Sequence, residues 1–193
     1  IFAGLGVETT LIYRGPNILR GFDDDVRAHL AGEIEKRGIK VILGCQHKSI
    51  EKTATGLVNH LENGMTIETD VVMFATGRAP YTQGLGLEEL GVKLGRKGEI
   101  VVDEWSQTSV PSIYAVGDVT DRVNLTPVAI REGHSFADTV FGAKPRKVDH
   151  SLVASAVYTR PHELATVGLT EEQAAARGPA DVYVASFRPM RSL

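Results

Sequence analysis

The chain has 193 residues, 42% of them hydrophobic, and a formal net charge of −3. This length permits one large domain or parts of two or three. The slightly acidic balance, without basic runs, gives no footprint for nucleic acid or an anionic membrane surface. No apolar run approaches the ~20 residues that a membrane span requires.

Cys45 is the only cysteine, which excludes an internal disulfide and a CxxC redox pair. It follows an apolar run, so we expect a buried and inert thiol rather than a nucleophile. The six histidines show no ligand spacing, and we expect no metal site.

The first half of the chain has the pattern of a βαβ unit. Residues 1–6 resemble the end of a helix that closes on glycine, and the absence of a starting methionine or signal-peptide pattern suggests a piece of a longer protein. We expect a strand over Val7 to Tyr13, a helix from Asp23 to Arg37 and a buried strand over Ile39 to Leu43. Asp23 is a suitable N-cap, and apolar residues recur at i+4 along the helix.

A β-meander is predicted next. Two short strand-like runs, Gly56 to His60 and Met65 to Thr69, flank Glu62-Asn63-Gly64. Asn-Gly between such runs is a strong hairpin signal. The apolar run Asp70 to Thr76 predicts a further strand, so the chain up to residue 80 is expected to be α/β with an attached meander.

The middle of the chain predicts fewer elements. Short and buried strands are expected over Ile100 to Asp103 and Thr108 to Asp118. A helix should begin near Thr126-Pro127, where proline occupies its favoured first turn, and continue to about Phe141.

The last region predicts a small α+β arrangement. Strands are expected over Ala154 to Tyr158, Leu164 to Val167 and Val182 to Phe187. Thr170-Glu171-Glu172-Gln173 is a capping-box sequence that should start a helix.

Two arginines follow the first predicted strand. Arg14 and Arg20 bracket the loop that leads to the helix, and no acid occupies the strand end. In a dinucleotide-binding βαβ unit, NAD-preferring sites place Asp or Glu here to bind the ribose 2′-hydroxyl. A 2′-phosphate instead requires cations, ideally guanidinium groups. The pair therefore favours NADPH, while two solvated surface arginines are the alternative.

A second candidate site lies at Gly117-Asp118 and Thr126. A glycine lets the main chain approach a ligand, and the neighbouring carboxylate accepts hydrogen bonds from sugar hydroxyls. The helix start at Thr126 offers free N–H groups and the positive end of a dipole, which stabilise negative charge. An ordinary turn acid beside an ordinary helix is the alternative.

These segments together resemble the glutathione-reductase-type flavoprotein disulfide reductases, which are FAD- and NADPH-dependent pyridine nucleotide-disulfide oxidoreductases. The resemblance covers nearly the whole chain. The segments that carry it are YRGPNILRGFD, ATGRAP, TSVPSIYAVGDVTDRVNLTPVAIREG and AVYTRPHELATVGLTE.

The resemblance implies a role for each matched residue. Arg14 and Arg20 would bind the NADPH 2′-phosphate, Gly77 would lie near the nicotinamide nucleotide, and Arg78 would approach a dinucleotide phosphate. Around FAD, the implied residues are Asp118 at the ribityl chain, Asn124 and Leu125 beside the flavin and nicotinamide, and Thr126, whose N–H would face the flavin pyrimidine edge. In such enzymes hydride passes from NADPH to FAD, and electrons continue through a cysteine pair to a disulfide.

The resemblance also implies a division into three partial domains. These are the C-terminal part of a Rossmann-like NADPH domain with its meander (1–78), the C-terminal part of an FAD domain (79–148) and the start of an α+β dimerisation domain (149–193). The parent is expected to be a cytosolic homodimer that binds neither nucleic acid nor membrane.

The substrate is less constrained than the cofactors. Glutathione disulfide is the expected substrate, and His134 stands where some relatives place a carboxylate-binding arginine. An exposed helix histidine is the alternative. The segment GDVTDRVNLTPVAIREG is also similar to that of trypanothione-type relatives. The alternative function is therefore that of a trypanothione-type or another NADPH-dependent flavin disulfide reductase. Because the redox cysteine pair is absent, the chain alone is expected to be inactive, and a non-catalytic nucleotide-binding or dimerising module is the second hypothesis.

Overall fold

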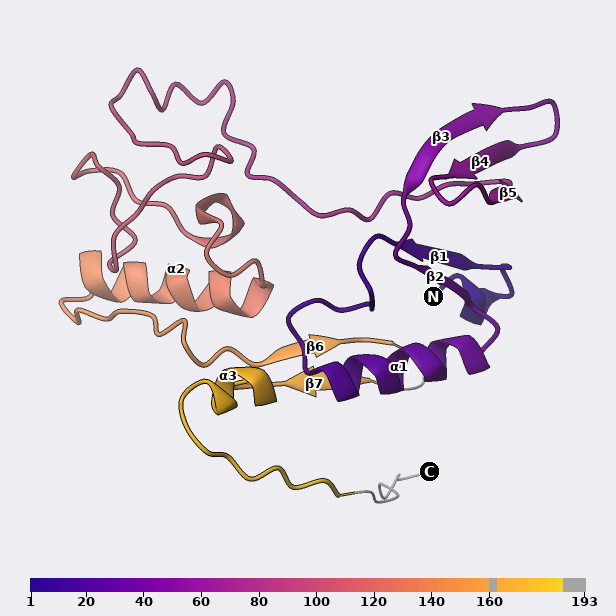
Figure 1. Cartoon of the computed structure of the whole chain (residues 1–193). Coiled ribbons are helices and arrows are strands. Elements are labelled where there is room, and N and C mark those ends of the chain that lie inside the picture. Colours follow the sequence, from indigo (N-terminus) through magenta and orange to yellow (C-terminus); the bar gives the residue numbers. More distant parts are fainter. Residues whose placement is uncertain (160–162, 186–193) are drawn as a thin grey trace. The chain divides into compact units, whose positions relative to one another are not determined.

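The computed structural model describes residues 1–159 and 163–185. The chain forms two compact units, one of Ile1–Met73 with Ala154–Leu193 and one of Phe74–Val153 (Figure 1). The division into three partial domains stays a prediction.

The first unit begins with the predicted βαβ arrangement. Strand β1 (Thr10–Tyr13) and strand β2 (Lys40–Leu43) are parallel, and helix α1 (Asp24–Lys36) connects them. Asp23 occupies the N-cap position, and acidic residues fill the first turn, as expected for the positive end of the helix dipole. A short 3-10 helix (Ala3–Leu5) closes on Gly6 in the left-handed conformation, which confirms the predicted glycine cap.

An antiparallel sheet follows, with strand order β3-β4-β5. Strands β4 (Leu57–Leu61) and β5 (Thr66–Thr69) form the hairpin that Asn-Gly predicted. Strand β3 (His47–Lys52) was not predicted, because five of its six residues are exposed and its sequence, HKSIEK, lacks the apolar alternation of a half-buried strand. It forms through main-chain pairing with β4.

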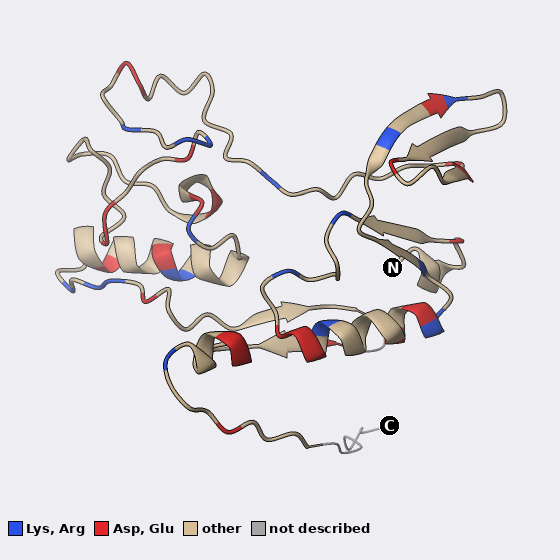
Figure 2. Ribbon diagram, in the orientation of Figure 1, with Lys and Arg blue, Asp and Glu red and all other residues tan. Residues whose placement is uncertain are grey.

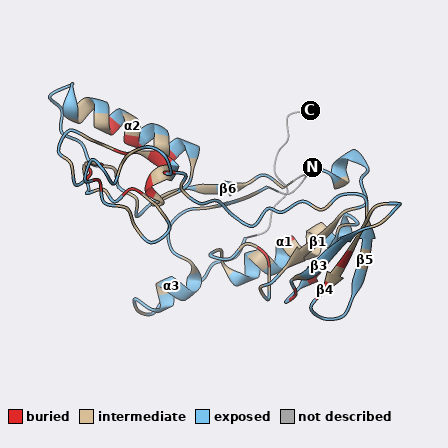
Figure 3. Cartoon of the chain, turned by 90° about the horizontal axis from the view of Figure 1, so that it is seen from above, coloured by how far each residue is buried: buried red, intermediate tan, exposed pale blue. Residues whose placement is uncertain are grey.

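The core of this unit forms between β2 and the antiparallel sheet. Ile42, Cys45 and Leu61 are buried together, with Ile12 and Ile67 packed against them. The Cys45 thiol is therefore buried, as predicted. Figure 3 shows buried residues along β4 in this unit and beside α2 in the other.

The strand predicted over Asp70 to Thr76 is wrong. This segment has no regular structure, and Val71 keeps 74% of its surface exposed. An apolar run of this kind is typical of a strand covered on both faces. Within the described residues no strand pairs with this segment, so it does not form part of a sheet.

The second unit consists mostly of turns around one long helix. Helix α2 (Thr126–Val140) lies where the sequence predicted it, with Pro127 in its first turn. The strands expected over Ile100 to Asp103 and Thr108 to Asp118 are wrong, since these segments form only isolated bridges. Ile100 and Ala115 are nonetheless buried in a cluster with Val92, and other apolar residues of these segments pack partly buried against it. Burial among turns thus produced the same apolar pattern as a strand.

The C-terminal elements of the first unit are short. Strands β6 (Ser155–Val157) and β7 (Leu164–Thr166) form an antiparallel pair, and helix α3 (Glu171–Ala175) starts at the predicted Thr170 capping box. The strand predicted over Val182 to Phe187 is wrong for residues 182–185, which are exposed and without regular structure, and its end lies outside the described residues.

Candidate nucleotide-binding sites

The loop between β1 and α1 carries the arginine pair. Arg14 and Arg20 are exposed, and neither guanidinium forms a hydrogen bond or ion pair with another described residue. Arg14 directly follows the last residue of β1, and no carboxylate stands at that strand end. Both cations are therefore available to an anionic ligand.

Arg27 of α1 anchors this loop from the helix side. Its Nε donates to the Ile18 carbonyl at 2.7 Å, and its Nη2 donates to the Asn17 carbonyl at 2.9 Å. Its Nη1 pairs with Asp24 at 2.5 Å, and its side chain is only 13% exposed. Sequence reasoning missed Arg27, because an arginine in the second turn of a helix normally indicates a surface pair with the preceding acid.

The backbone of the same loop is held in a defined shape. Leu19 and Gly21 have positive φ angles of 54° and 98°. At Gly15, an added Cβ would lie 2.6 Å from Cε1 of Tyr13, so the tyrosine ring covers this residue. The Gly15 carbonyl also accepts a hydrogen bond from the Gly44 N–H at 2.9 Å. The arginine-bearing loop is thus tied to both β2 and α1.

A small pocket in the second unit gathers three of the predicted residues. Arg78, Asp118 and Asn124 line it, with the remaining wall formed by Ala79, Pro80, Tyr81 and Val119. Its volume is about 160 Å³. Pockets that enclose a whole small ligand have roughly 300–1,000 Å³, so this one suits part of an extended ligand. A cation, a carboxylate and an amide line the same space, and the cation comes from a segment 40 residues before the carboxylate.

The other predicted residues lie outside this pocket. Gly77 adjoins it in sequence and has a positive φ of 117°, which favours glycine. Leu125 is half-buried, Thr126 is exposed at the first turn of α2, and neither lines the pocket. His134 is exposed on α2 and is also not a lining residue.

The start of α2 has the features of an anion-stabilising helix end. Its N-cap, Leu125, is extended and offers no side-chain hydrogen bond to the first turn. Within that turn Pro127 has no N–H, and the Val128 N–H donates to the Leu125 carbonyl at 3.0 Å. The Thr126 N–H therefore lacks the usual Ser, Thr or Asp acceptor. A ligand acceptor at this position would gain both the hydrogen bond and the dipole.

Asp118 lies in the 3-10 turn Gly117–Thr120, which packs against α2. Gly117 is buried with a φ of 75°, and an added Cβ would lie 3.1 Å from the Cβ of Ala129. A glycine is required here by both the left-handed backbone and the close approach. Asp118 itself is exposed, so the turn presents its carboxylate at the pocket.

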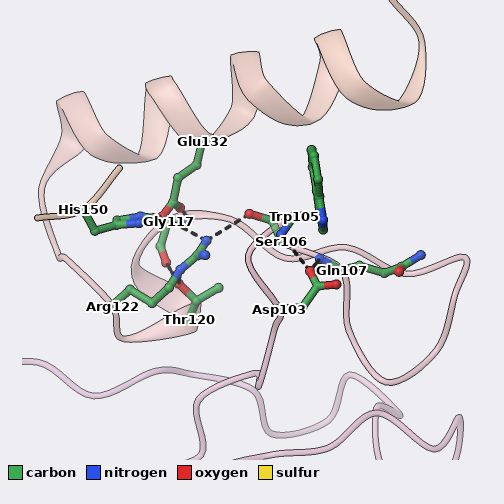
Figure 4. Close-up of polar contacts among 9 residues, drawn as sticks. All are labelled: Asp103, Trp105, Ser106, Gln107, Gly117, Thr120, Arg122, Glu132 and His150. Carbon is green, nitrogen blue, oxygen red and sulfur yellow. Dashed lines mark hydrogen bonds and ion pairs between the residues drawn. The ribbon is translucent and has the colours of Figure 1, made fainter. Parts of the chain in front are cut away.

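A buried carboxylate, Glu132, lies behind this turn and was missed by sequence reasoning. It receives the Gly117 N–H and pairs with Arg122 and His150 (Figure 4). The signal that could have found it is its spacing, since Glu132 stands four residues after the apolar Val128 and three before Ser135, on the face of α2 that is buried.

Asp121 is the C-cap of the turn and has a left-handed backbone. Hydrogen bonds from Lys97 and Asn124 hold the pKa of the Asp121 carboxyl below its usual value, and the same carboxylate raises the pKa of Lys97. The Asn124 amide donates to Asp121 Oδ1 at 3.1 Å, which orients this pocket residue.

Charges of both signs are interspersed along each unit (Figure 2). In the described part of the chain, no group of three or more His, Cys, Asp or Glu side chains is arranged to hold a metal ion. None of the helices described there is both long and apolar enough to cross a membrane.

Comparison with known proteins shows the family of the chain. Residues 1–133 match the family described as pyridine nucleotide-disulphide oxidoreductase. The chain belongs to this family. The resemblance noted in the sequence is thereby confirmed, and so is the α/β fold class.

Curated members of the family align over nearly all of the chain. Identity is 51% with a glutathione reductase of Burkholderia cepacia, across 100% of this chain and 43% of that protein. It is 48% with a trypanothione reductase of Trypanosoma congolense, across 96% of this chain and 38% of that protein. The chain thus spans less than half the length of these members.

Solved structures of other proteins share the fold of the chain. The HOCl-induced flavoprotein disulfide reductase RclA of Escherichia coli superposes with a TM-score of 0.85 at 29% identity, over 93% of this chain and 41% of that one. LpdA of Mycobacterium tuberculosis superposes with a TM-score of 0.84 at 31% identity, over 93% of this chain and 39% of that one. Both similarities extend across the two units.

Proposed function

We propose that the full-length protein is an NADPH-dependent flavoprotein disulfide reductase that reduces glutathione disulfide. The observation that carries this proposal is the convergence of Arg78, Asp118 and Asn124 on one pocket. Asp118 and Asn124 belong to one sequence segment and Arg78 to another, 40 positions before Asp118. When bound, FAD and NADPH supply the hydride chemistry.

The residues of the pocket fit a flavin nucleotide. Asp118 accepts hydrogen bonds from the ribityl hydroxyls, and Arg78 offers a cation to a dinucleotide phosphate. Asn124 and Leu125 contact the flavin and nicotinamide side, while Gly77 allows the nicotinamide nucleotide to approach the main chain. The uncapped start of α2 offers the Thr126 N–H and a positive dipole end to negative charge on the ligand.

The arginine loop supports NADPH over NADH. Arg14 and Arg20 are exposed, and no described residue neutralises them. A 2′-phosphate is a dianion at neutral pH, whereas a 2′-hydroxyl gains little from two guanidinium groups. Because Arg27 and the main-chain bonds hold the loop, the two cations are presented with little ordering cost on binding.

The disulfide step requires residues outside this chain. Cys45 is the only cysteine and is buried in the core of the first unit. The exchanging cysteine pair would therefore come from the rest of the protein. We further propose a cytosolic homodimer in which residues 149–193 begin the subunit interface, and we assign His134, exposed on α2, to a glutathione carboxylate.

A trypanothione-type substrate is the alternative within the same reaction class, and the high identity with the T. congolense enzyme favours it. A different class, a nucleotide-binding or dimerising module without redox chemistry, is favoured by the single buried cysteine.

Steady-state kinetics of the full-length protein distinguish these functions. We expect turnover with NADPH and glutathione disulfide, weak activity with NADH and little with trypanothione disulfide. Equal use of NADH would refute the role of the arginine pair. A preference for trypanothione disulfide would show that the alternative substrate is the correct one. Nucleotide binding without reduction of any disulfide would support the second hypothesis, a module without redox chemistry.

A further inference from the structure

We propose that Glu132 is a positioning residue for FAD, because it fixes the Gly117–Thr120 turn that presents Asp118 to the ligand. The inference rests on the proposed function, in which Asp118 binds the ribityl chain. Glu132 itself lies behind the turn and does not line the pocket. Its effect would be transmitted through the main chain.

The Glu132 carboxylate is buried and fully engaged. Its side chain is 1% exposed. Oε2 accepts from the Gly117 N–H at 2.6 Å, while Oε1 lies 2.9 Å from Nη2 of Arg122 and 2.6 Å from Nε2 of His150 (Figure 4). A buried carboxylate is tolerated only with such compensation. The charge is therefore held in one place, with one oxygen committed to the turn.

Both polar main-chain groups of Gly117 are fixed by this arrangement. Its N–H donates to Glu132, and its carbonyl accepts from Oγ1 of Thr120 at 2.8 Å. Its Cα lies against Ala129, one helical turn before Glu132 on α2. Glu132 holds the Val116–Gly117 peptide through the Gly117 N–H, and Thr120 holds the Gly117–Asp118 peptide through the Gly117 carbonyl. Because Asp118 follows these two fixed peptides, the direction of its side chain depends on both contacts.

Arg122 provides a second connection from Glu132 to the same turn. Besides its ion pair with Glu132, its Nε donates to Thr120 Oγ1 at 3.3 Å and its Nη2 to Ser106 Oγ at 3.0 Å. Glu132 thus holds the first residue of the turn directly and the last through Arg122. Glu132 differs in this respect from a surface ion pair of α2 such as Asp138 with Arg146, which does not contact the turn.

The experiment is a double-mutant cycle on FAD affinity in the full-length protein. The variants are Glu132→Gln, Asp118→Asn and their combination, and each apoprotein is titrated with FAD by flavin fluorescence. The control is Asp138→Asn, the same chemical change on the same helix, where the carboxylate forms a surface pair with Arg146 at 2.8 Å.

We expect Glu132→Gln to raise the FAD dissociation constant about tenfold, and Asp138→Asn to leave it unchanged. If Glu132 acts through Asp118, the double variant binds FAD about as weakly as Asp118→Asn alone. A purely structural role would leave the two effects additive.

The outcomes separate the inference from the proposed function. Additive effects overturn the inference and leave the role of Asp118 intact. An unchanged FAD affinity in Asp118→Asn overturns the proposed role of Asp118 and the inference with it. If Glu132→Gln fails to fold, Glu132→Asp is the second variant. It keeps the charge but shortens the side chain, so that the carboxylate no longer reaches the Gly117 N–H. Wild-type FAD affinity in this variant overturns the inference.

Discussion

The guanidinium of Arg27 donates from Nε to the carbonyl of Ile18 at 2.7 Å, which ties the first helix to the loop that bears Arg14 and Arg20. Arg27 already uses its donors on the main chain and on Asp24. It therefore shapes the proposed phosphate site without being a phosphate ligand. This relationship leads to the first prediction.

Replacing Arg27 with Met should loosen the loop. We expect the Michaelis constant for NADPH to rise roughly three- to tenfold with kcat nearly unchanged, because two main-chain hydrogen bonds are lost while both phosphate-binding cations remain. The control is Lys36→Met, which removes a surface pair with Glu33 on the same helix. A fall in kcat with an unchanged Michaelis constant would contradict the anchoring role.

Removing the arginine pair should change cofactor choice. In Arg14→Ala with Arg20→Ala, we expect the Michaelis constant for NADPH to rise roughly 10- to 100-fold, with little change for NADH. Arg96→Ala, at an exposed arginine of the second unit, should affect neither cofactor. Equal effects of the double variant on both cofactors would exclude a 2′-phosphate site.

Gly117 should tolerate no side chain. Gly117→Ala combines a φ of 75° with a Cβ placed 3.1 Å from Ala129. We expect the free energy of unfolding, measured with urea, to fall by about 1–3 kcal/mol. Gly133→Ala is the matched control in α2, where an added Cβ meets nothing within 4 Å. That variant should gain about 0.5–1 kcal/mol, and equal effects at both sites would refute the argument.

The pair of Lys97 and Asp121 should make stability depend on acid pH. The pKa of Asp121 is lowered in the folded state, mainly by the hydrogen bond from Lys97. Its stabilising effect is therefore complete above about pH 3.9, the value of an unperturbed aspartate, and is lost as the pH falls through the lowered pKa.

Urea unfolding of the wild type and of Asp121→Asn at several pH values between neutral and strongly acidic tests this. The wild type should be the more stable at neutral pH, with the difference vanishing in acid. Asp70→Asn, at an exposed carboxylate, serves as the control. A difference that persists unchanged under strongly acidic conditions would rule out Asp121 as its source.

Local patterns predicted the helices and the hairpin well. Asp23 and the i+4 apolar spacing located α1, Asn63-Gly64 located the β4–β5 hairpin, and Thr170 with Gln173 located the start of α3. Each of these signals acts between residues close in sequence. For that reason these predictions do not depend on which tertiary contacts the segment makes.

Strands were predicted less well, because a strand exists only when another segment pairs with it. The polar β3 forms since β4 lies beside it, while the apolar segments at residues 70–76 and 108–118 lack a ladder in the described chain. An apolar run indicates that a segment is buried, but it does not indicate which secondary structure the segment has. Packing among the turns around Ala115 selects the same apolar residues as packing within a sheet.

The sequence by itself determined which chemical groups the protein carries: the arginine pair, Gly117-Asp118, the start of α2 and the family to which they belong. Only the tertiary structure brought Arg78, Asp118 and Asn124 to one pocket and placed Arg27 and Glu132 behind the two sites. The reason is physical. A ligand-facing residue is marked by its type and its local motif, whereas a supporting residue is defined by main-chain groups that approach it only when the chain has folded.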